Sequence, residues 1–264
     1  MQRLGLSLLL AALLVGAAPA RAVDVTPHRA TYEMTLAKSQ PASGITSAEG
    51  RMIFEWGDGC DGWVVQQHYD LTMGYEETGE SKVSIAFVTW ESKDGLHYRY
   101  NVRKLRDGQP DEDLKGEASV PDSDKPGEAV FSKPADKRVP LEPHTLFPTG
   151  HTLALVKAAI AGETFVARKV FDGGTVAGAD QVSAGIGPMH EADPNDPEPL
   201  LRKRWWPVRM AFFGADSGDN AQPDYELGMD LQEDGIARNM TLDYGTFTVR
   251  AKLAKIEKLP PPRC

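Results

Sequence analysis

The amino-acid sequence predicts a mainly β protein in which an antiparallel meander of about a dozen strands curls, or closes, around one helix. Two observations predict this class. Six Asp-Gly pairs separate short stretches of alternating apolar and polar residues, most of them at the spacing of β-hairpins. Residues 141–163 change instead to the 3.6-residue apolar period of a helix. The sequence contains no internal repeat or linker, so we expect a single domain over residues 23–264.

The predicted helix has little polar surface. Thr149 is expected to be its N-cap, and Gly162 is expected to end it, because glycine readily adopts the left-handed conformation of a C-cap. The expected buried stripe consists of Leu153, Val156 and Ile160, widened by Leu155 and Ala159. A short helix of this kind needs cover on most sides, which a curved sheet provides. The alternative is a helix that lies on one flat face of a sheet.

Strict alternation marks the expected strands. In residues 50–56, for example, Met52, Phe54 and Trp56 share one face, as in a strand with one buried and one wet side. The expected strands cover residues 30–36, 50–56, 63–73, 83–90, 96–102, 114–118, 129–131, 139, 165–171, 176–186, 205–212, 225–231, 236–242 and 247–253. Glycines in 176–186 predict a bulged or bent strand. Four prolines and several acidic residues make 188–199 an expected exposed loop.

The first 22 residues are expected to be a secretory signal peptide rather than part of the fold. Arg3 precedes an apolar run over 4–15, and Ala20-Arg21-Ala22 fits the small-x-small cleavage pattern. The run is too short to span a membrane, and no cysteine near the cleavage site suggests a lipid anchor. No later run approaches membrane length. We therefore expect a soluble protein outside the cytoplasm, with no transmembrane span.

The charge balance disfavours two classes of partner. The whole chain has a formal net charge of −9, and removal of residues 1–22 leaves 27 basic against 38 acidic side chains, a net charge of −11. An acidic surface repels nucleic acid and anionic lipid head groups.

The two cysteines, Cys60 and Cys264, would lie in a compartment where disulfides persist. Their pairing would close a loop of about 205 residues and contribute at most roughly 5 kcal/mol by the chain-entropy estimate. An intermolecular disulfide is the main alternative. A catalytic thiol is disfavoured, because neither cysteine has the CxxC or Cys/His spacing of such sites.

The search for other chemistry finds little. None of the six histidines has metal-ligand spacing, and the closest to a pair, His144 and His151, are interpreted as making a helix-terminus hydrogen bond or lying at the surface. Hydrolase-elbow, Walker and Rossmann motifs are absent. The acidic run that starts at Asp193 lacks the glycine and terminal glutamate of an EF-hand loop. The sequence thus predicts no catalytic, cofactor-binding or metal-ligating residue.

One basic-aromatic cluster leaves two interpretations open. Arg202, Lys203 and Arg204 directly precede Trp205 and Trp206. They would either form a recognition patch for an acidic glycan or lipid head group, or lie at a strand edge with the tryptophans in the core. The second interpretation is favoured.

A series of landmarks along the chain resembles a known family. They are Pro27-His28-Arg29-Ala30-x-Tyr32, Gly50-Arg51-Met52 with Glu55, Cys60-Asp61-Gly62-Trp63, Phe147-Pro148-Thr149-x-His151, Val170-Phe171-Asp172-Gly173, Trp206-Pro207-Val208 with Phe212-Phe213, Asp243-Tyr244-Gly245-x-Phe247 and the terminal Cys264. Together, in this order, they resemble the cell-envelope integrity protein EipB family, which is periplasmic in Gram-negative bacteria. The resemblance covers essentially all of the chain after residue 22.

The resemblance implies an open, spiralled, antiparallel β-barrel-like sheet wrapped around one central α-helix, with a disulfide between Cys60 and Cys264. It also implies a periplasmic protein without enzymatic activity that maintains the envelope. We therefore expect a non-enzymatic protein that binds another envelope component, either a periplasmic protein or a hydrophobic ligand. The alternative is a carrier that shelters a lipid or lipoprotein acyl chain between sheet and helix. A hydrolase of envelope polymers is the third candidate and would need a polar cleft.

Overall fold

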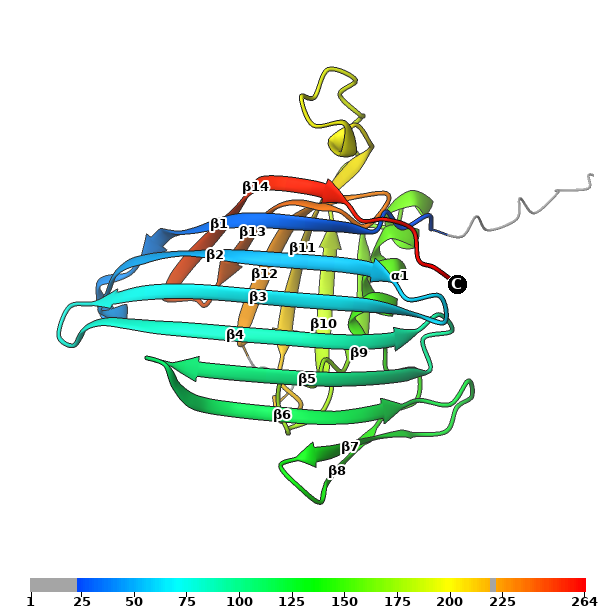
Figure 1. Cartoon of the computed structure of the whole chain (residues 1–264), viewed down its shortest axis with the longest axis horizontal. Coiled ribbons are helices and arrows are strands. Elements are labelled where there is room, and N and C mark those ends of the chain that lie inside the picture. The colour runs from blue at the N-terminus through cyan, green and yellow to red at the C-terminus, as the bar shows by residue number, and fades with distance from the viewer. Residues whose placement is uncertain (1–22, 219–221) are drawn as a thin grey trace, which may run out of the picture.

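A single antiparallel sheet of fourteen strands forms the framework of the computed structural model, which describes residues 23–218 and 222–264 (Figure 1). The expected signal peptide lies outside these residues. The strands are β1 (His28–Ser39), β2 (Ile45–Asp58), β3 (Gly62–Tyr75), β4 (Gly79–Ser92), β5 (His97–Arg106), β6 (Gln109–Ser119), β7 (Gly127–Lys133), β8 (Lys137–Leu141), β9 (Phe165–Val170), β10 (Asp180–Ile186), β11 (Trp205–Phe213), β12 (Tyr225–Gln232), β13 (Ala237–Asp243) and β14 (Phe247–Lys258). The helix α1 spans Pro148–Ala161. The predicted mainly β, open antiparallel fold is confirmed.

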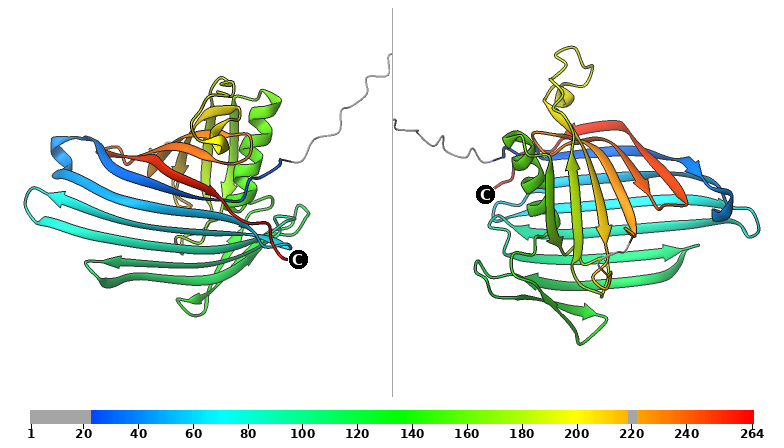
Figure 2. Two further views of the ribbon diagram at one scale, coloured as in Figure 1. Left: turned by 45° about the horizontal axis from the view of Figure 1, so that its top comes forward. Right: turned by 180° about the vertical axis from the view of Figure 1, so that it is seen from behind.

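The strand order places the two ends of the chain in the middle of the sheet. Strands β1 to β8 follow one another on one side, β14 to β9 on the other, and β1 pairs with β14. The free edges are therefore β8 and β9, which flank the helix in sequence. Figures 1 and 2 show that the sheet curls, so that β9–β12 cross behind β1–β6. Leu146 links the two edges, because its N–H and C=O pair with Lys169 and Phe171 of the β9 segment at 2.9 Å each.

The observed strands extend beyond several of the expected ones: β2 and β6 begin five residues earlier, and β14 ends five residues later. One expected strand is instead considerably shorter. The strand expected over 176–186 begins at Asp180. The preceding residues turn, with Gly173 at φ 74° and Gly178 at φ 131°, conformations that a residue with a side chain rarely adopts. Gly173 also lies under an aromatic ring, because a Cβ there would approach the Tyr100 ring to 2.5 Å. A glycine-bearing bend therefore replaces the first half of the expected strand.

The helix packs against the wall formed by β9–β12. Its buried apolar side chains are Leu155, Val156, Ala158 and Ala159, in one cluster with Val166, Val182, Ala184, Ile186, Trp206, Val208, Met210 and Leu231. The expected stripe was wrong in two of its members: Leu153 is half-buried, and Ile160 is 50% exposed. The wall contacts the helix on the side of Leu155 and Ala159, so the side that carries Ile160 faces solvent.

The ends of the helix are held by different partners. Phe147 occupies the N-cap position and Pro148 begins the helix, so Thr149 is not the N-cap as expected. The carboxylate of Glu91 on β4 takes that role, accepting hydrogen bonds from the backbone N–H groups of Thr149 (2.8 Å) and Gly150 (2.7 Å). At the other end Gly162, at φ 79°, forms the predicted left-handed C-cap.

An aromatic cluster fills the space beside the N-terminus of the helix. It consists of Tyr98, Tyr100, Phe131, Phe147 and Phe171, each at most 2% exposed. The Tyr98 ring stacks on Phe147 with centroids 4.9 Å apart, and its hydroxyl donates to the carbonyl of Asp172 at 3.0 Å. Since these residues come from β5, β7 and the segments flanking α1 and β9, the cluster joins the two halves of the sheet.

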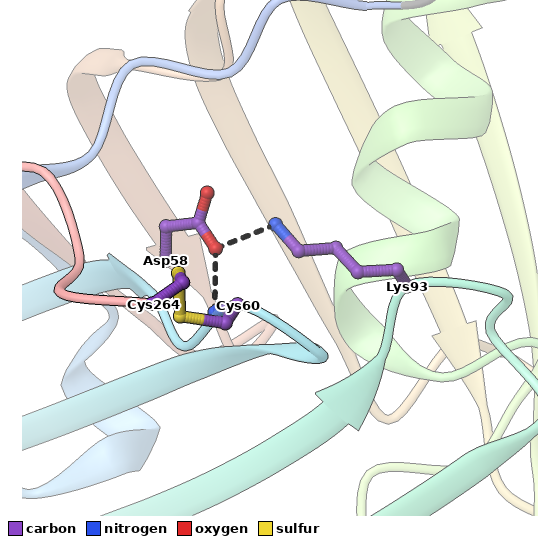
Figure 3. Close-up of a disulfide and its surroundings, with 4 residues drawn as sticks. All are labelled: Asp58, Cys60, Lys93 and Cys264. Carbon is purple, nitrogen blue, oxygen red and sulfur yellow. Dashed lines mark hydrogen bonds and ion pairs between the residues drawn. A yellow bond between two sulfur atoms is a disulfide. The ribbon is translucent and has the colours of Figure 1, made fainter.

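The structure contains a disulfide between Cys60 and Cys264, with their Cα atoms 5.9 Å apart (Figure 3). Cys60 lies at the tip of the turn between β2 and β3. The neighbouring Asp58 carboxylate accepts from the Cys60 N–H at 2.9 Å and pairs with the Lys93 ammonium group at 2.9 Å. The bond therefore fixes the C-terminal tail to a turn that two polar contacts already hold.

Replacement of Cys60 by serine tests what this bond contributes. The Cys60→Ser variant should lose about 2–5 kcal/mol of stability in oxidising buffer, because its unfolded chain is no longer constrained by the closed loop. Thermal melts with and without reductant measure this effect. In reductant, wild type and variant should melt alike, and Cys264→Ser should behave as Cys60→Ser does. Equal melting of wild type and variant in oxidising buffer would contradict an intramolecular bond.

Glu91 gives stability a dependence on pH. Burial, opposed by the hydrogen bonds from Thr149 and Gly150, raises the pKa of the Glu91 carboxyl from its ordinary 4.5 to about 7. The folded protein therefore holds this proton more tightly than the unfolded chain. The stabilisation of the folded state by this bound proton is fully present below about pH 4.5 and is lost as the pH rises through about 7.

In the Glu91→Gln variant this loss should vanish. The stability of wild type relative to the variant should fall by on the order of 3 kcal/mol between about pH 4 and about pH 8. Denaturant unfolding at a series of pH values measures it. Burial, and then Arg168, lowers the pKa of His151 to about 4, but that contribution is common to both proteins and cancels in the difference. Glu163→Gln, at an exposed position, is the control. If the difference in stability between wild type and Glu91→Gln did not change with pH, the role of Glu91 would be refuted.

Candidate functional site

The concave face of the sheet carries large apolar side chains that remain half-buried. Across β3 and β4, Tyr69 faces Ile85 and Leu71 faces Val83, on the same side as the buried core residue Met52. On the opposite wall, β11 and β12 contribute a matching set. The half-buried residues of this concave lining are Tyr69, Leu71, Val83, Ile85, Phe87, Phe212, Tyr225, Leu227 and Met229. The apolar surface of the two walls is thus only partly covered by the rest of the chain.

A line of aromatic rings borders the concave lining. Phe212 stacks on Tyr225 with centroids 4.4 Å apart, and Tyr225 lies 6.0 Å from Tyr244. Tyr244 in turn stacks on Phe247 at 4.8 Å, although it is 43% exposed. The rings come from β11, β12 and the turn between β13 and β14. Together they continue the apolar surface to the border of the sheet.

Carboxylates lie near this lining. Burial, and then the negative charges of Asp172 and Asp224, raise the pKa of Asp180 to about 6. Burial also raises the pKa of the Tyr69 hydroxyl, with smaller contributions from Tyr244 and Asp172. Acidic and hydroxyl groups thus accompany the apolar side chains of this lining.

The two histidines beside the helix differ in environment. His144 is exposed and pairs with Asp124 at 2.9 Å, as expected for a surface residue. His151 is only 5% exposed, and its Nε2 atom has no hydrogen-bond partner among the residues that the structure describes. His151 is thus a core residue, which neither part of its sequence-based interpretation covers. Within residues 23–218 and 222–264, no group of three or more potential ligands is arranged to hold a metal ion.

The basic cluster before β11 is engaged in internal contacts. Lys203 pairs with Asp234 at 3.0 Å, and Arg204 donates to Glu233 at 3.0 Å. Arg202 donates to the backbone carbonyl of Asp196 at 2.9 Å. These contacts hold the loop that projects beyond the sheet, drawn in yellow in Figure 1. The recognition patch is therefore not supported.

The strand-edge interpretation of this cluster was also incomplete. Trp206 is buried in the core as expected, but β11 is an internal strand that pairs with both β10 and β12. Trp205 is half-buried and stacks on His190 with centroids 4.0 Å apart. In the acidic run, the Asp193 carboxylate accepts from the N–H of Asn195 at 2.8 Å. These groups shape the projecting loop.

Sequence reasoning missed two features of this region. Glu91 lies on the inner face of β4, two residues beyond Thr89 and four beyond Phe87, so a charge in an otherwise apolar alternation was its signal. The concave lining had no such signal, because half-buried and fully buried positions show the same alternation.

Among the described residues, no helix is long and apolar enough to cross a membrane.

Comparison with known proteins is consistent with this architecture. The EipB-like family matches residues 19–260. The cell envelope integrity protein EipB of Brucella abortus (strain 2308) is 30% identical over 248 residues, which are 91% of this chain and 87% of that protein. A crystal structure of a beta-barrel-like protein of a domain of unknown function from Brucella abortus superposes with a TM-score of 0.83 at 28% identity, covering 90% of this chain and 100% of that one. The resemblance drawn from the sequence motifs is confirmed, and the chain belongs to the EipB-like family.

Proposed function

We propose that this protein is a non-enzymatic periplasmic protein that supports the integrity of the cell envelope by binding another envelope component. Membership of a family with a cell envelope integrity protein supports the role. The signal-peptide pattern of residues 1–22 supports export. The concave lining is the observation that carries the binding function, because its large apolar side chains are only partly covered and contiguous apolar surface of this kind often marks an interaction site.

The favoured component is an apolar chain, such as the acyl chain of a lipid or lipoprotein. Covering apolar surface contributes roughly 25 cal/mol per Å². The lining offers aliphatic and aromatic side chains from two facing walls, with the helix at one end and the line of aromatic rings at the border. A flexible hydrocarbon chain fits such a surface without requiring directional polar contacts.

A hydrolase is less well supported. Ser84, Asp70 and His68 lie together on the outer face of β3 and β4, but both Ser84 and His68 bond to the carboxylate of Asp70. In a serine hydrolase the histidine must bond to the serine hydroxyl in order to take its proton. Because His68 contacts Asp70 and not Ser84, the Ser84 hydroxyl has no histidine base to take its proton.

Loss of the gene should sensitise cells to detergents and other envelope stresses, because a binding protein of the envelope would be missing. Growth of deletion and wild-type strains on graded detergent measures this. Complementation with the intact gene should restore resistance. A deletion strain whose stress profile equals that of the wild type would refute the envelope role.

Binding of an apolar chain should depend on the concave lining. Palmitate, followed by native mass spectrometry and by displacement of a fluorescent fatty acid, should bind the wild type. Ile85→Asn should weaken binding by about tenfold or more, because it places an amide within the apolar surface. Ala86→Asn, on the outer face of the same strand, is the matched control and should bind as the wild type does. Protein that purifies free of lipid and ignores palmitate would rule out the carrier role.

A further inference from the structure

The outer face of the sheet has a groove of its own, of about 470 Å³, across β3 to β7. Apolar side chains from three strands form part of its wall: Val64, Val88, Trp90 and Val130. Val88 is 45% exposed and is one of the few large apolar side chains that the described chain leaves open to this degree. The volume lies within the range of small-molecule sites in proteins.

The register of the strands assembles the groove from two cross-strand rows. In one row Val64 pairs with Trp90, Trp90 with Arg99, and Arg99 with Glu117. In the adjacent row, Val88 pairs with Asn101 and Asn101 with Lys115. Three strand spacings amount to about 14 Å, so the rows run across the strands for the length of two or three sugar rings.

The polar side chains of these rows are uncommitted. Arg99, Asn101, Lys115 and Glu117 are exposed, and none of them makes a side-chain hydrogen bond or ion pair with another described residue. Arg99 contacts the Trp90 indole instead, 4.8 Å from the ring centroid. By contrast, neighbouring charges on β6 and β7 are paired, as in the 2.8 Å ion pair between Lys133 and Asp113. Two cations, an amide and a carboxylate thus remain free around an apolar wall.

This combination selects a particular chemistry. Arg99 and Lys115 supply charge-assisted donors for a carboxylate, whereas Asn101 and Glu117 supply acceptors for hydroxyl groups. Trp90 and the valines offer apolar surface for the C–H faces of a sugar ring. A bare phosphate ion would leave that surface unused.

We propose that this groove binds a carboxylate-bearing oligosaccharide, with the carboxylate on Arg99 and Lys115 and the hydroxyl groups on Asn101 and Glu117. The site lies on the opposite face of the sheet from the concave lining, so it extends the proposed function and does not depend on it. Sugar binding on one face would let the protein hold an envelope polymer while the other face remains free.

Isothermal titration of the full chain without its signal peptide, using trigalacturonate as the acidic probe and maltotriose as the neutral one, tests the proposal. Trigalacturonate should bind, with an affinity that falls as salt is added, and maltotriose should bind at least tenfold more weakly. Lys115→Gln should weaken trigalacturonate binding about tenfold. Arg103→Gln, two residues beyond Asn101 on the same face of β5 but outside the groove, should leave it unchanged.

Further binding measurements distinguish this proposal from the alternatives. A muramic-acid disaccharide and an acidic lipopolysaccharide core oligosaccharide identify the natural source, and binding of either through Lys115 supports the proposal. Ile85→Asn should bind trigalacturonate normally, so loss of palmitate binding and loss of sugar binding can be told apart. Absence of trigalacturonate binding at millimolar concentration, equal effects of Lys115→Gln and Arg103→Gln, or Lys115-dependent binding to phosphatidylglycerol vesicles in place of sugar would overturn it.

Discussion

Two hydrogen bonds to the buried carboxyl group of Glu91 hold the start of the helix against the end of β4. Glu91 comes from the end of β4, whereas the amides that it accepts belong to Thr149 and Gly150 of α1. An open sheet of fourteen strands has no closing ladder to fix its curvature. Here the curvature depends on contacts between the walls: this carboxylate, the Tyr98–Phe147 stack and the pairing of Leu146 with β9. The separation of the walls, and with it the concave lining, follows from these contacts.

The two faces of the sheet are suited to different ligands. The concave lining is apolar, so the ligand proposed for it has few polar groups. The outer groove is shallow, and its polar side chains reach toward solvent, which suits a ligand that is itself hydrated. Strand alternation makes this possible, because adjacent residues such as Phe87 and Val88 lie on opposite faces, about 3.3 Å apart along the strand. One set of strands can therefore serve two unrelated binding surfaces.

Most of the strands could be predicted from the sequence, because each hairpin is local and alternation reports it directly. The helix was predicted, and so were Leu155, Val156 and Ala159 of its buried face, but Ile160 was wrongly included because the wall that the helix meets decides which side is covered. The group that caps its N-terminus belongs to Glu91, which is 58 residues away in the sequence. Capping rules consider only residues nearby in the sequence and therefore could not predict it. The outer groove required the register between β3 and β6, since Trp90, Arg99 and Glu117 are adjacent only after the strands have paired.

The pairing of β1 with β14 has a consequence for the order of assembly. During synthesis β1 emerges early and must wait for the last strand of the chain, while the hairpins on either side form from neighbouring segments. Until that central seam closes, two long strand edges are open to pairing with other chains. A shortened product that lacks residues 247–264, and with them all of β14, would therefore be left with a slit through the centre of the sheet, rather than with a frayed border.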